Sequence, residues 1–282
     1  KIDITKYNEL KKNNDRPLFN RALNGQYPPG STVKPFIGLA GLEMKKVTSD
    51  TSHFCPGFFQ LPGNEHRYRD WKRIGHGDTT LQKAISQSCD VFYYQLALDL
   101  GIDELSNFLK KFGFGEKSGI DLIGESKGIL PSRKWKEKQK KEPWYPGETV
   151  IMGIGQGYYL STPLQLAIAT AAIANGGKYF TPRLVDFLKT HKEEDHRSIP
   201  PASSTILIES ENLKKIQNAM VDVIEAPNGT ARNIFTRQYK IAGKTGTSQV
   251  FSIAQDQEYE EETVVKKRRD HALFIAYAPI KE

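Results

Sequence analysis

The chain has few cysteines and no long apolar run. Cys55 and Cys89 are the only cysteines among its 282 residues, so at most one disulfide bond can form within it. No stretch of about 18 apolar residues occurs, which excludes a membrane-spanning helix in this sequence, and no signal peptide is visible. With 38% hydrophobic and 26% charged residues, the composition is ordinary for a globular protein. This length can bury one large core, or one core with a helical subdomain.

The chain also lacks the patterns of nucleic-acid- and nucleotide-binding proteins. Its formal net charge is +7, but the basic residues are scattered. The densest clusters, 134–141 and 266–269, are not interleaved with aromatic residues in the manner of a recognisable nucleic-acid-binding module and indicate a solvated face, so we expect no nucleic-acid partner. The glycine-rich stretch 153–157 lacks the spacing and acidic partner of a dinucleotide fold. It predicts a turn in which Gln156 either faces a cleft or has a structural role.

Apolar periodicity and capping residues predict the elements. Expected helices are 4–12, 31–45, 80–87, 90–100, a helix capped by Asp103 and ending at residue 113, a helix from Thr162 and Pro163 to residue 175, and 210–225. Expected strands are 180–188, 239–250 and 270–278, and residues 58–61 and 67–71 can form a short hairpin. Residues 114–159 should be loop with little regular structure, 189–204 an exposed polar loop, and 228–231 a turn.

One stretch, Tyr-Pro-Pro-Gly-Ser-Thr-Val-Lys-Pro at 27–35, has the arrangement of a nucleophile and its base. Ser31 falls at the start of a helix, and Lys34 follows one turn later on the same face. A serine hydroxyl becomes a good nucleophile only when a base lies within hydrogen-bond reach. The positive end of the helix lowers the pKa of a nearby lysine and can stabilise an oxyanion. Taken alone, the pattern also fits a capped helix with a surface lysine.

Two further motifs make catalysis the stronger interpretation. Ser88-Cys89-Asp90 lies between two helical patterns, and Lys244-Thr245-Gly246-Thr247 ends a strand-like run. The order Ser-x-x-Lys, Ser-x-Asp, Lys-Thr-Gly resembles that of serine penicillin-binding proteins and serine β-lactamases. The stretches 15–21, 27–35, 153–157 and 162–166 resemble class B penicillin-binding proteins, and most of all the penicillin-binding protein 2 branch, the transpeptidases of rod elongation. The resemblance covers nearly the whole chain.

The resemblance implies an α+β fold, in which an antiparallel sheet is flanked by helices and a helical subdomain forms the other wall of a cleft. Residues 1–282 are then one transpeptidase domain, without the membrane anchor and pedestal domain of the family. Family members have sheet strands before the nucleophile and a strand and helix after the segment 270–278. We therefore expect the sheet to be incomplete in this chain.

The resemblance also implies roles for the motif residues. Ser31 would attack a terminal D-Ala-D-Ala bond and form an acyl-enzyme, with Lys34 as the base and Ser88 as the proton relay to the leaving amine. Lys244 would keep these groups correctly protonated and attract the substrate carboxylate. The backbone N–H groups of Ser31 and Thr247 would form the oxyanion hole.

The remaining motif positions are expected to bind substrate: Asp90, Thr245, Gly246 and Thr247. Asp90 stands where asparagine is commoner, as in the rod-elongation branch. A carboxylate between two lysines favours their charged forms, so we expect Asp90 to be placed where it spares Lys34.

Cysteine, histidine and aspartate between residues 53 and 89 offer a set of zinc ligands. The candidates in this stretch are His53, Cys55, His66, Asp70, His76 and Cys89. The penicillin-binding protein 2 branch carries a zinc site beside the active site, and its positions correspond to Cys55, Asp70, His76 and Cys89. We predict a structural Zn²⁺ and no organic cofactor. A disulfide bond between the cysteines and two free buried thiols are the alternatives.

The predicted function is a peptidoglycan D,D-transpeptidase that cross-links stem peptides, is acylated by β-lactams and acts in cell elongation. The alternatives are a serine β-lactamase, which must also deacylate quickly, and a non-catalytic β-lactam sensor or scaffold for wall assembly. The resemblance implies a membrane glycan polymerase and an elongation scaffold as partners. It also implies a location at the periplasmic face of the bacterial inner membrane.

Overall fold

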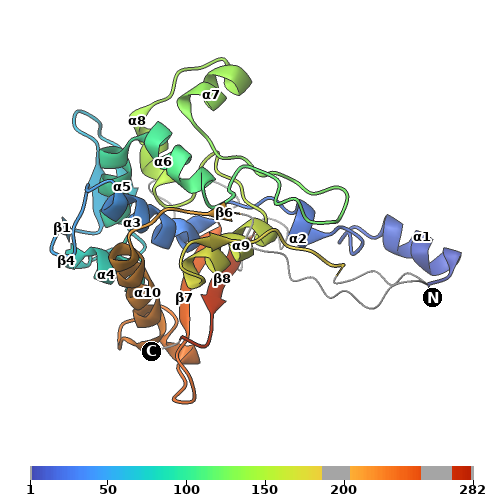
Figure 1. The fold of residues 1–282 in the computed structure, drawn as a ribbon. Helices are drawn as coiled ribbons and strands as arrows, with labels where there is room; N and C mark the ends of the chain where they lie inside the picture. The colour runs from blue at the N-terminus through green and yellow to red at the C-terminus, as the bar shows by residue number, and fades with distance from the viewer. Residues whose placement is uncertain (1, 186–203, 249–268, 281–282) are drawn as a thin grey trace.

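The computed structural model describes residues 2–185, 204–248 and 269–280, and shows helices packed around small antiparallel sheets (Figure 1). This confirms the predicted α+β class. The helices are α1 Ile4–Lys12, α2 Arg21–Asn24, the 3₁₀ turn η1 Gly30–Val33, α3 Lys34–Glu43, α4 Leu81–Ser86, α5 Asp90–Leu100, α6 Ile102–Lys110, α7 Arg133–Lys140, α8 Pro146–Met152, α9 Pro163–Ala174, α10 Ser210–Glu225 and the 3₁₀ turn η2 Arg232–Ile234.

Each described strand pairs with one partner, always antiparallel. The pairs are β1 Ser52–Cys55 with β4 Gly77–Thr80, β2 Phe58–Gln60 with β3 Arg67–Arg69, β5 Lys178–Tyr179 with β6 Ser204–Thr205, and β7 Ala242–Ser248 with β8 His271–Tyr277. None of the helices in the described ranges is long and apolar enough to cross a membrane.

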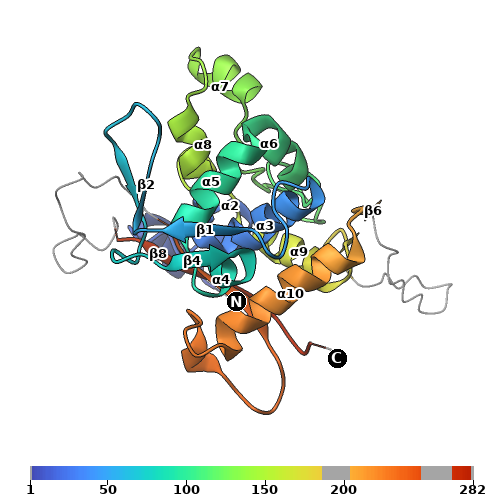
Figure 2. The same ribbon diagram turned by 90° about the vertical axis from the view of Figure 1, so that its left-hand side faces the viewer.

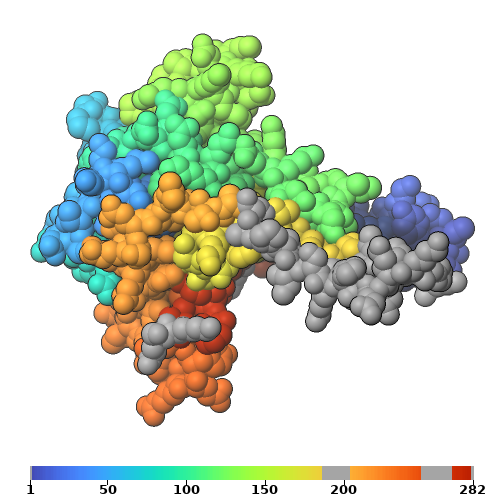
Figure 3. Space-filling view, viewed as in Figure 1, coloured from blue at the N-terminus to red at the C-terminus, as the bar shows by residue number. Residues whose placement is uncertain are grey.

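The helix α3 lies at the centre of the core. Every residue from Lys34 to Leu42 is buried, and α3 contacts α4, α5, α6 and α10, which surround it (Figure 2). A helix that is apolar on all sides must be covered on all sides. The opposite case is α1, which has no buried residue and projects from the body of the molecule (Figure 1, Figure 3).

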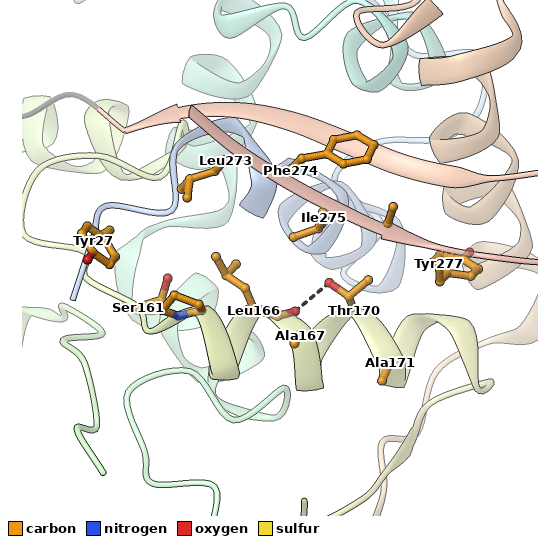
Figure 4. A pocket seen from close by; sticks show the side chains of 12 residues that line it. Tyr27, Ser161, Leu166, Ala167, Thr170, Ala171, Leu273, Phe274, Ile275 and Tyr277 are labelled. Carbon is orange, nitrogen blue, oxygen red and sulfur yellow. Dashed lines mark hydrogen bonds between the residues drawn. The ribbon is translucent and has the colours of Figure 1, made fainter. Parts of the chain in front are cut away.

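The strands β7 and β8 carry the third motif, and helices cover them. The register pairs Lys244 with Ile275 and Thr245 with Phe274, while α10 contacts β7 and α9 contacts β8. An apolar pocket of about 310 Å³ separates α9 from β8, and Leu166 lines it from the helix (Figure 4). Within the described residues this sheet has only two strands, as expected of an incomplete one.

Several helix predictions are confirmed, because local caps define the helix ends. α5 begins at Asp90 and ends before Gly101, and α1, α4 and α10 form where predicted. α9 starts with a capping box, in which Thr162 and Gln165 each accept a hydrogen bond from the other's backbone N–H. The hairpin at 58–71 is also confirmed, as β2 and β3.

The prediction that residues 114–159 lack regular structure is wrong, because α7 and α8 form there. α7 has no apolar stripe, so periodicity cannot reveal it: its one buried residue is Lys136. The Lys136 ammonium pairs with Glu148 of α8 and lies 4.5 Å from the centroid of the Tyr145 ring. An ion pair between the two helices, buried on the side of Lys136, therefore replaces the usual apolar contact.

Three smaller predictions also need correction. Residues 180–185 are not a strand, because pairing ends with β5 at Tyr179. Asp103 does not cap α6, since Gly101 takes that position and the Asp103 carboxylate instead accepts from the backbone and guanidinium of Arg133. The helix expected at 31–45 starts as a 3₁₀ turn at Gly30. The parts of the predictions that concern residues 186–203 and 249–250 fall outside the described residues.

The turn at 153–157 lies behind the nucleophile, as predicted. Gly155 has φ +71°, and its carbonyl accepts a hydrogen bond of 2.9 Å from the backbone N–H of Gly30. A Cβ atom at Gly155 would collide with the backbone oxygen of Gly30. The position therefore requires glycine both for its left-handed backbone and for the close approach of the two chain segments.

Replacing Gly155 with alanine should disturb the nucleophile turn as well as the backbone. We expect Gly155→Ala to lower the free energy of unfolding by about 3 kcal/mol, because strain and collision add. Gly176→Ala is the matched control, since its φ is +72° but nothing lies within 4 Å of the added Cβ; we expect a loss of about 1 kcal/mol. Urea denaturation of both variants measures the difference, and equal losses would contradict the collision.

Candidate active site

The three motifs meet at one pocket of about 430 Å³. Its lining comes from η1, the start of α5, the strand β7 and three connecting segments: Ser31, Trp71, Ser88, Asp90, Ile154, Gln156, Thr230, Thr245, Gly246 and Thr247. All catalytic and substrate-binding residues predicted from the sequence therefore line this pocket, except for the two lysines. Lys34 and Lys244 lie fully buried behind it.

Ser31 owes its position to a turn that is packed on both sides. Gly30, which precedes it, has φ +54°, and a Cβ there would strike the backbone of Thr247. Gly246 lies equally close to Thr32 on the other side of the nucleophile. Two glycines thus let the turn and β7 approach each other closely, which places Ser31 beside the end of the strand.

Ser88 is the centre of a hydrogen-bond chain between the two lysines. Its Oγ lies 2.8 Å from Nζ of Lys244 and 3.3 Å from Nζ of Lys34. The carbonyl of Ser88 also accepts a hydrogen bond of 2.8 Å from Lys34. The Ser88 backbone has φ +59°, a left-handed conformation that is rare for serine and directs its hydroxyl to this position. The chain offers a route for a proton between two buried amines.

Asp90 pairs with Lys34, contrary to the expectation that it spares this lysine. Its Oδ1 lies 2.7 Å from Nζ of Lys34, and its Oδ2 accepts from the backbone N–H of Trp71 at 3.1 Å. The reason is local geometry: α5 begins at Asp90, which faces the first turn of α3. The one carboxylate among the described pocket residues therefore balances the charge of Lys34.

The pKa of Lys244 lies well below that of an ordinary lysine. Burial is the main cause, because a charged amine loses its hydration, and the positive charge of Lys34 adds to it. The Asp90 carboxylate acts in the opposite direction but is the smallest of the three effects. Lys244 therefore loses its proton more readily than an ordinary lysine does.

Residues that the motifs do not include complete the pocket. The Thr230 hydroxyl lies 2.7 Å from that of Thr245, and the Gln156 amide donates to the carbonyl of Thr247 at 2.9 Å. Trp71 lines the opposite wall, where its indole N–H donates to the carbonyl of Gln87. The sequence predicted a turn at Thr230 and a hairpin at Trp71, but only tertiary packing brings them to the site.

Four side chains that the sequence selected as metal ligands converge next to this pocket. Cys55, Asp70, His76 and Cys89 are all buried, and their ligand atoms lie within 4.8 Å of one another. No disulfide bond joins the two cysteines, which are both free.

The distances within this four-residue group fit a tetrahedral zinc site. Cys55 Sγ lies 3.5 Å from Asp70 Oδ2 and 3.6 Å from His76 Nδ1. Cys89 Sγ lies 3.4 Å from Asp70 Oδ2, and Asp70 Oδ1 lies 3.4 Å from His76 Nδ1. Bonds of about 2.3 Å to sulfur and about 2.0–2.1 Å to nitrogen or oxygen place tetrahedral ligand atoms about 3.3–3.8 Å apart. The donor set and spacing therefore suit Zn²⁺.

Asp70 links this group to the active site. Its Oδ2 accepts hydrogen bonds from the backbone N–H groups of Asp90 (2.7 Å) and Val91 (3.1 Å) at the start of α5. Cys89, the N-cap residue, makes no such bond with its own side chain. Asp70 thus caps α5 from a loop that is distant in the sequence. The positive end of the helix stabilises the negative charge of its carboxylate.

Burial and charge set the pKa values of this group. Burial opposes the charge of Asp70, but hydrogen bonds from His76 and from the backbone of Lys72 and Val91 hold its pKa far below the usual range. Burial raises the pKa of both cysteines, and the neighbouring Asp70 carboxylate raises it further. A bound cation would reverse this, because a metal stabilises the thiolate form of its ligands.

Known proteins resemble this chain in both sequence and fold. The family described as penicillin binding protein transpeptidase domain matches residues 3–282. The peptidoglycan D,D-transpeptidase MrdA of Acinetobacter baumannii is 44% identical over 99% of this chain. A crystal structure of Pseudomonas aeruginosa PBP2 in complex with WCK 5153 has a TM-score of 0.85 and 43% identity, covering 99% of this chain and 59% of that one.

Two further similar structures are complexes. One is PBP2 of Helicobacter pylori with MreC, with a TM-score of 0.80 and 36% identity over 99% of this chain and 48% of that one. The other is described as a peptidoglycan synthase complex that coordinates polymerization and crosslinking, with a TM-score of 0.79 and 31% identity over 100% of this chain and 44% of that one. The chain spans only 41% of the length of the Acinetobacter relative.

The low pKa of Lys244 makes stability depend on pH. Between its native pKa and about 10.4, the unfolded chain binds one proton more at this residue than the native chain does. This contribution to stability is therefore present above about 10.4 and is lost as pH falls through the native pKa. Relative to Lys244→Met, wild-type stability should rise with pH by up to about 1.4 kcal/mol per unit within that window.

Urea denaturation across the pH range measures this difference. Lys214→Met is the control, because Lys214 is exposed on α10 and should show no such pH-dependent difference. A constant gap between the wild type and Lys244→Met at every pH would contradict a depressed pKa.

Proposed function

Because this chain belongs to the penicillin-binding protein transpeptidase family, we propose that it is the catalytic part of a peptidoglycan D,D-transpeptidase of cell elongation. The observation that carries this proposal is the chain from Lys34 through Ser88 to Lys244, next to a serine on a glycine-supported turn. Its substrate is the D-Ala-D-Ala end of a stem peptide, and its product is a cross-link between two stems.

The first half-reaction forms an ester on Ser31. Its Oγ bonds to the substrate carbonyl carbon, and the amide bond to the terminal D-alanine breaks. The hydroxyl proton passes to Lys34 and, through Ser88, to the departing amine. The backbone N–H groups of Ser31 and Thr247 stabilise the developing oxyanion, as in the family. Lys244, with the hydroxyls of Thr245 and Thr247, attracts the substrate carboxylate.

The second half-reaction transfers the acyl group to another stem. The acceptor amine bonds to the ester carbonyl, the bond to Ser31 Oγ breaks, and the amine proton returns to that oxygen. The same residues that act in acylation act in this step in the reverse order.

The charge balance of the lysine cluster explains how it can provide a base. Asp90 balances one positive charge, so two charged lysines would leave one charge uncompensated in a buried site. The cluster is then most stable with one proton shared between the amines, and the Ser88 hydroxyl lets that proton move from Lys34 to Lys244. Moving it to Lys244 frees Lys34 to accept the proton of Ser31.

The pocket favours a long-lived acyl-enzyme over rapid hydrolysis. A β-lactamase needs a further base to activate water against the ester. Among the described residues that line the pocket, Asp90 is the only carboxylate, and Lys34 occupies it. A β-lactam should therefore remain attached to Ser31, which makes this site an antibiotic target.

We further propose that Cys55, Asp70, His76 and Cys89 hold a structural Zn²⁺. The support is the buried group of four ligands, two cysteines with an aspartate and a histidine, at nearly tetrahedral spacing. A zinc ion there would join the loop between β1 and β4 to the start of α5 and supply no group to the reaction. The active-site residues act without direct contact with it.

The complexes formed by two similar proteins support the kind of partner proposed here. The Helicobacter pylori relative forms a complex with MreC, and another similar structure belongs to a synthase complex that couples polymerization to crosslinking. We propose that this chain likewise works with a membrane glycan polymerase and an elongation scaffold, at the periplasmic face of the inner membrane.

A penicillin should label the wild-type chain once. We expect intact-mass spectrometry to show one adduct that persists for hours, because the pocket provides no second base. The Ser31→Ala chain should show no adduct, since the nucleophile is missing. An adduct that disappears within seconds would favour a β-lactamase, and labelling of Ser31→Ala would contradict the assigned nucleophile.

Purified wild-type chain should contain about one equivalent of zinc. His76→Ala removes one ligand and should reduce zinc affinity at least tenfold; it should also lower the thermal midpoint, because the loop loses its link to α5. Elemental analysis and thermal denaturation, with and without a chelator, measure both effects.

His66→Ala is the matched control for the zinc site. His66 lies in the same segment but outside the group of four, and it is exposed. Its zinc content should equal that of the wild type. Less than a tenth of an equivalent of zinc in the wild type, with no affinity on titration, would contradict the proposed site.

A further inference from the structure

A second cleft, rich in arginine, lies on the segment that forms one wall of the active site. It has a volume of about 470 Å³ and is lined by Gly57, Phe58, Glu65, Arg67, Arg69 and Arg73. We call it the arginine cleft. Three arginine side chains and one glutamate therefore line the same cleft.

The alternation of the β2–β3 hairpin explains why the arginines gather on one side. Successive side chains of a strand point to opposite faces. Tyr68 and Phe59 pair in the hairpin, and both rings pack against Tyr94 of α5. Arg67 and Arg69, one residue to either side of Tyr68, therefore share the face turned away from the core.

The cleft is held in shape on both sides. The Arg67 guanidinium lies 4.7 Å from the centroid of the Phe58 ring, a cation–π contact that orients its planar donors. Behind the cleft, the carbonyl of Gly57 accepts from the backbone N–H of Asp70 at 2.8 Å. An arginine that is oriented in this way suits a carboxylate, which it can bind through two parallel hydrogen bonds.

The arginine cleft and the active-site pocket adjoin along the chain. Arg69 and Arg73 flank Trp71, which lines the active-site pocket. Neighbouring Cα atoms are about 3.8 Å apart, so Arg69 and Trp71 lie at most about 7 Å from each other. An extended peptide of four residues spans roughly 13 Å and could reach from one to the other.

We propose that the arginine cleft binds a carboxylate of the acceptor stem peptide. This rests on the proposed transpeptidase function, which requires two peptide substrates. The donor carboxylate is assigned to the β7 wall, around Lys244, and leaves with the terminal D-alanine. The arginine cleft lies on the wall that includes Trp71, so a second peptide can bind there while the acyl group occupies Ser31.

The test measures peptide binding separately from catalysis. The probe is a synthetic stem tetrapeptide with a free side-chain amine and free carboxylates, and its partner is the same peptide with every carboxylate amidated. Calorimetry on the Ser31→Ala chain gives their dissociation constants without any turnover. We expect the amidated peptide to bind at least tenfold more weakly, because each charged hydrogen bond to arginine is lost.

The arginines are tested by the triple variant Arg67→Gln, Arg69→Gln, Arg73→Gln in the same chain. It should bind the carboxylate peptide at least tenfold more weakly and no longer distinguish it from the amidated one. The control variant Lys11→Gln, Lys12→Gln, Lys214→Gln loses the same charge at exposed sites on α1 and α10 and should bind like the parent chain.

Two outcomes would overturn the assignment. Equal binding of both peptides by the parent chain is one. The other is binding of phosphatidylglycerol vesicles that depends on the three arginines while the peptide affinity does not, which would assign the cleft to a lipid surface. Penicillin labelling of the wild type tests the transpeptidase function by itself, so the two ideas can fail independently.

Discussion

Two buried lysines share one serine hydroxyl, and a single carboxylate balances them. Removing an isolated charge from water costs several kcal/mol, so this cluster is stable only if its members hold the correct distances and protonation. Ser88 contributes both its hydroxyl and its carbonyl to the two amines. Its left-handed backbone, with φ +59°, is a local cost of about 1–2 kcal/mol that the surrounding contacts must offset. The cluster also joins three parts of the pocket, because its members come from α3, from the start of α5 and from β7.

The start of α5 holds Asp90 at the correct distance from Lys34. Asp70 receives the first two free N–H groups of α5, from Asp90 and Val91, and so fixes the helix end that carries the partner of Lys34. The sequence places Asp70 twenty residues earlier, in a segment without sustained periodicity. A long-range cap of this kind lets an irregular loop position a catalytic residue without any regular element of its own.

Much of the site could be predicted because its motifs are short and local. Ser31 and Lys34 lie within one helical turn, and the caps that define α5 and α9 lie next to their helices. The missed features depend on contacts between distant segments. Periodicity cannot reveal α7, because a charged pair replaces apolar burial there. No local sequence pattern predicts that β1 pairs with β4 or that the hydroxyl of Thr230 contacts that of Thr245. The pairing of Asp90 with Lys34 likewise depends on how α5 meets α3.

Different interactions hold the two walls of the pocket in place. The β7 wall rests on a seven-residue ladder with β8 and on α10 behind it, so backbone hydrogen bonds and apolar packing define it. The opposite wall, with Trp71, rests on side-chain contacts that converge on the Asp70 carboxylate. Because Asp70 Oδ2 also accepts from the N–H of Asp90, these contacts also hold the residue that pairs with Lys34. The Trp71 wall therefore depends on one buried carboxylate, whereas the strand wall depends on many backbone hydrogen bonds.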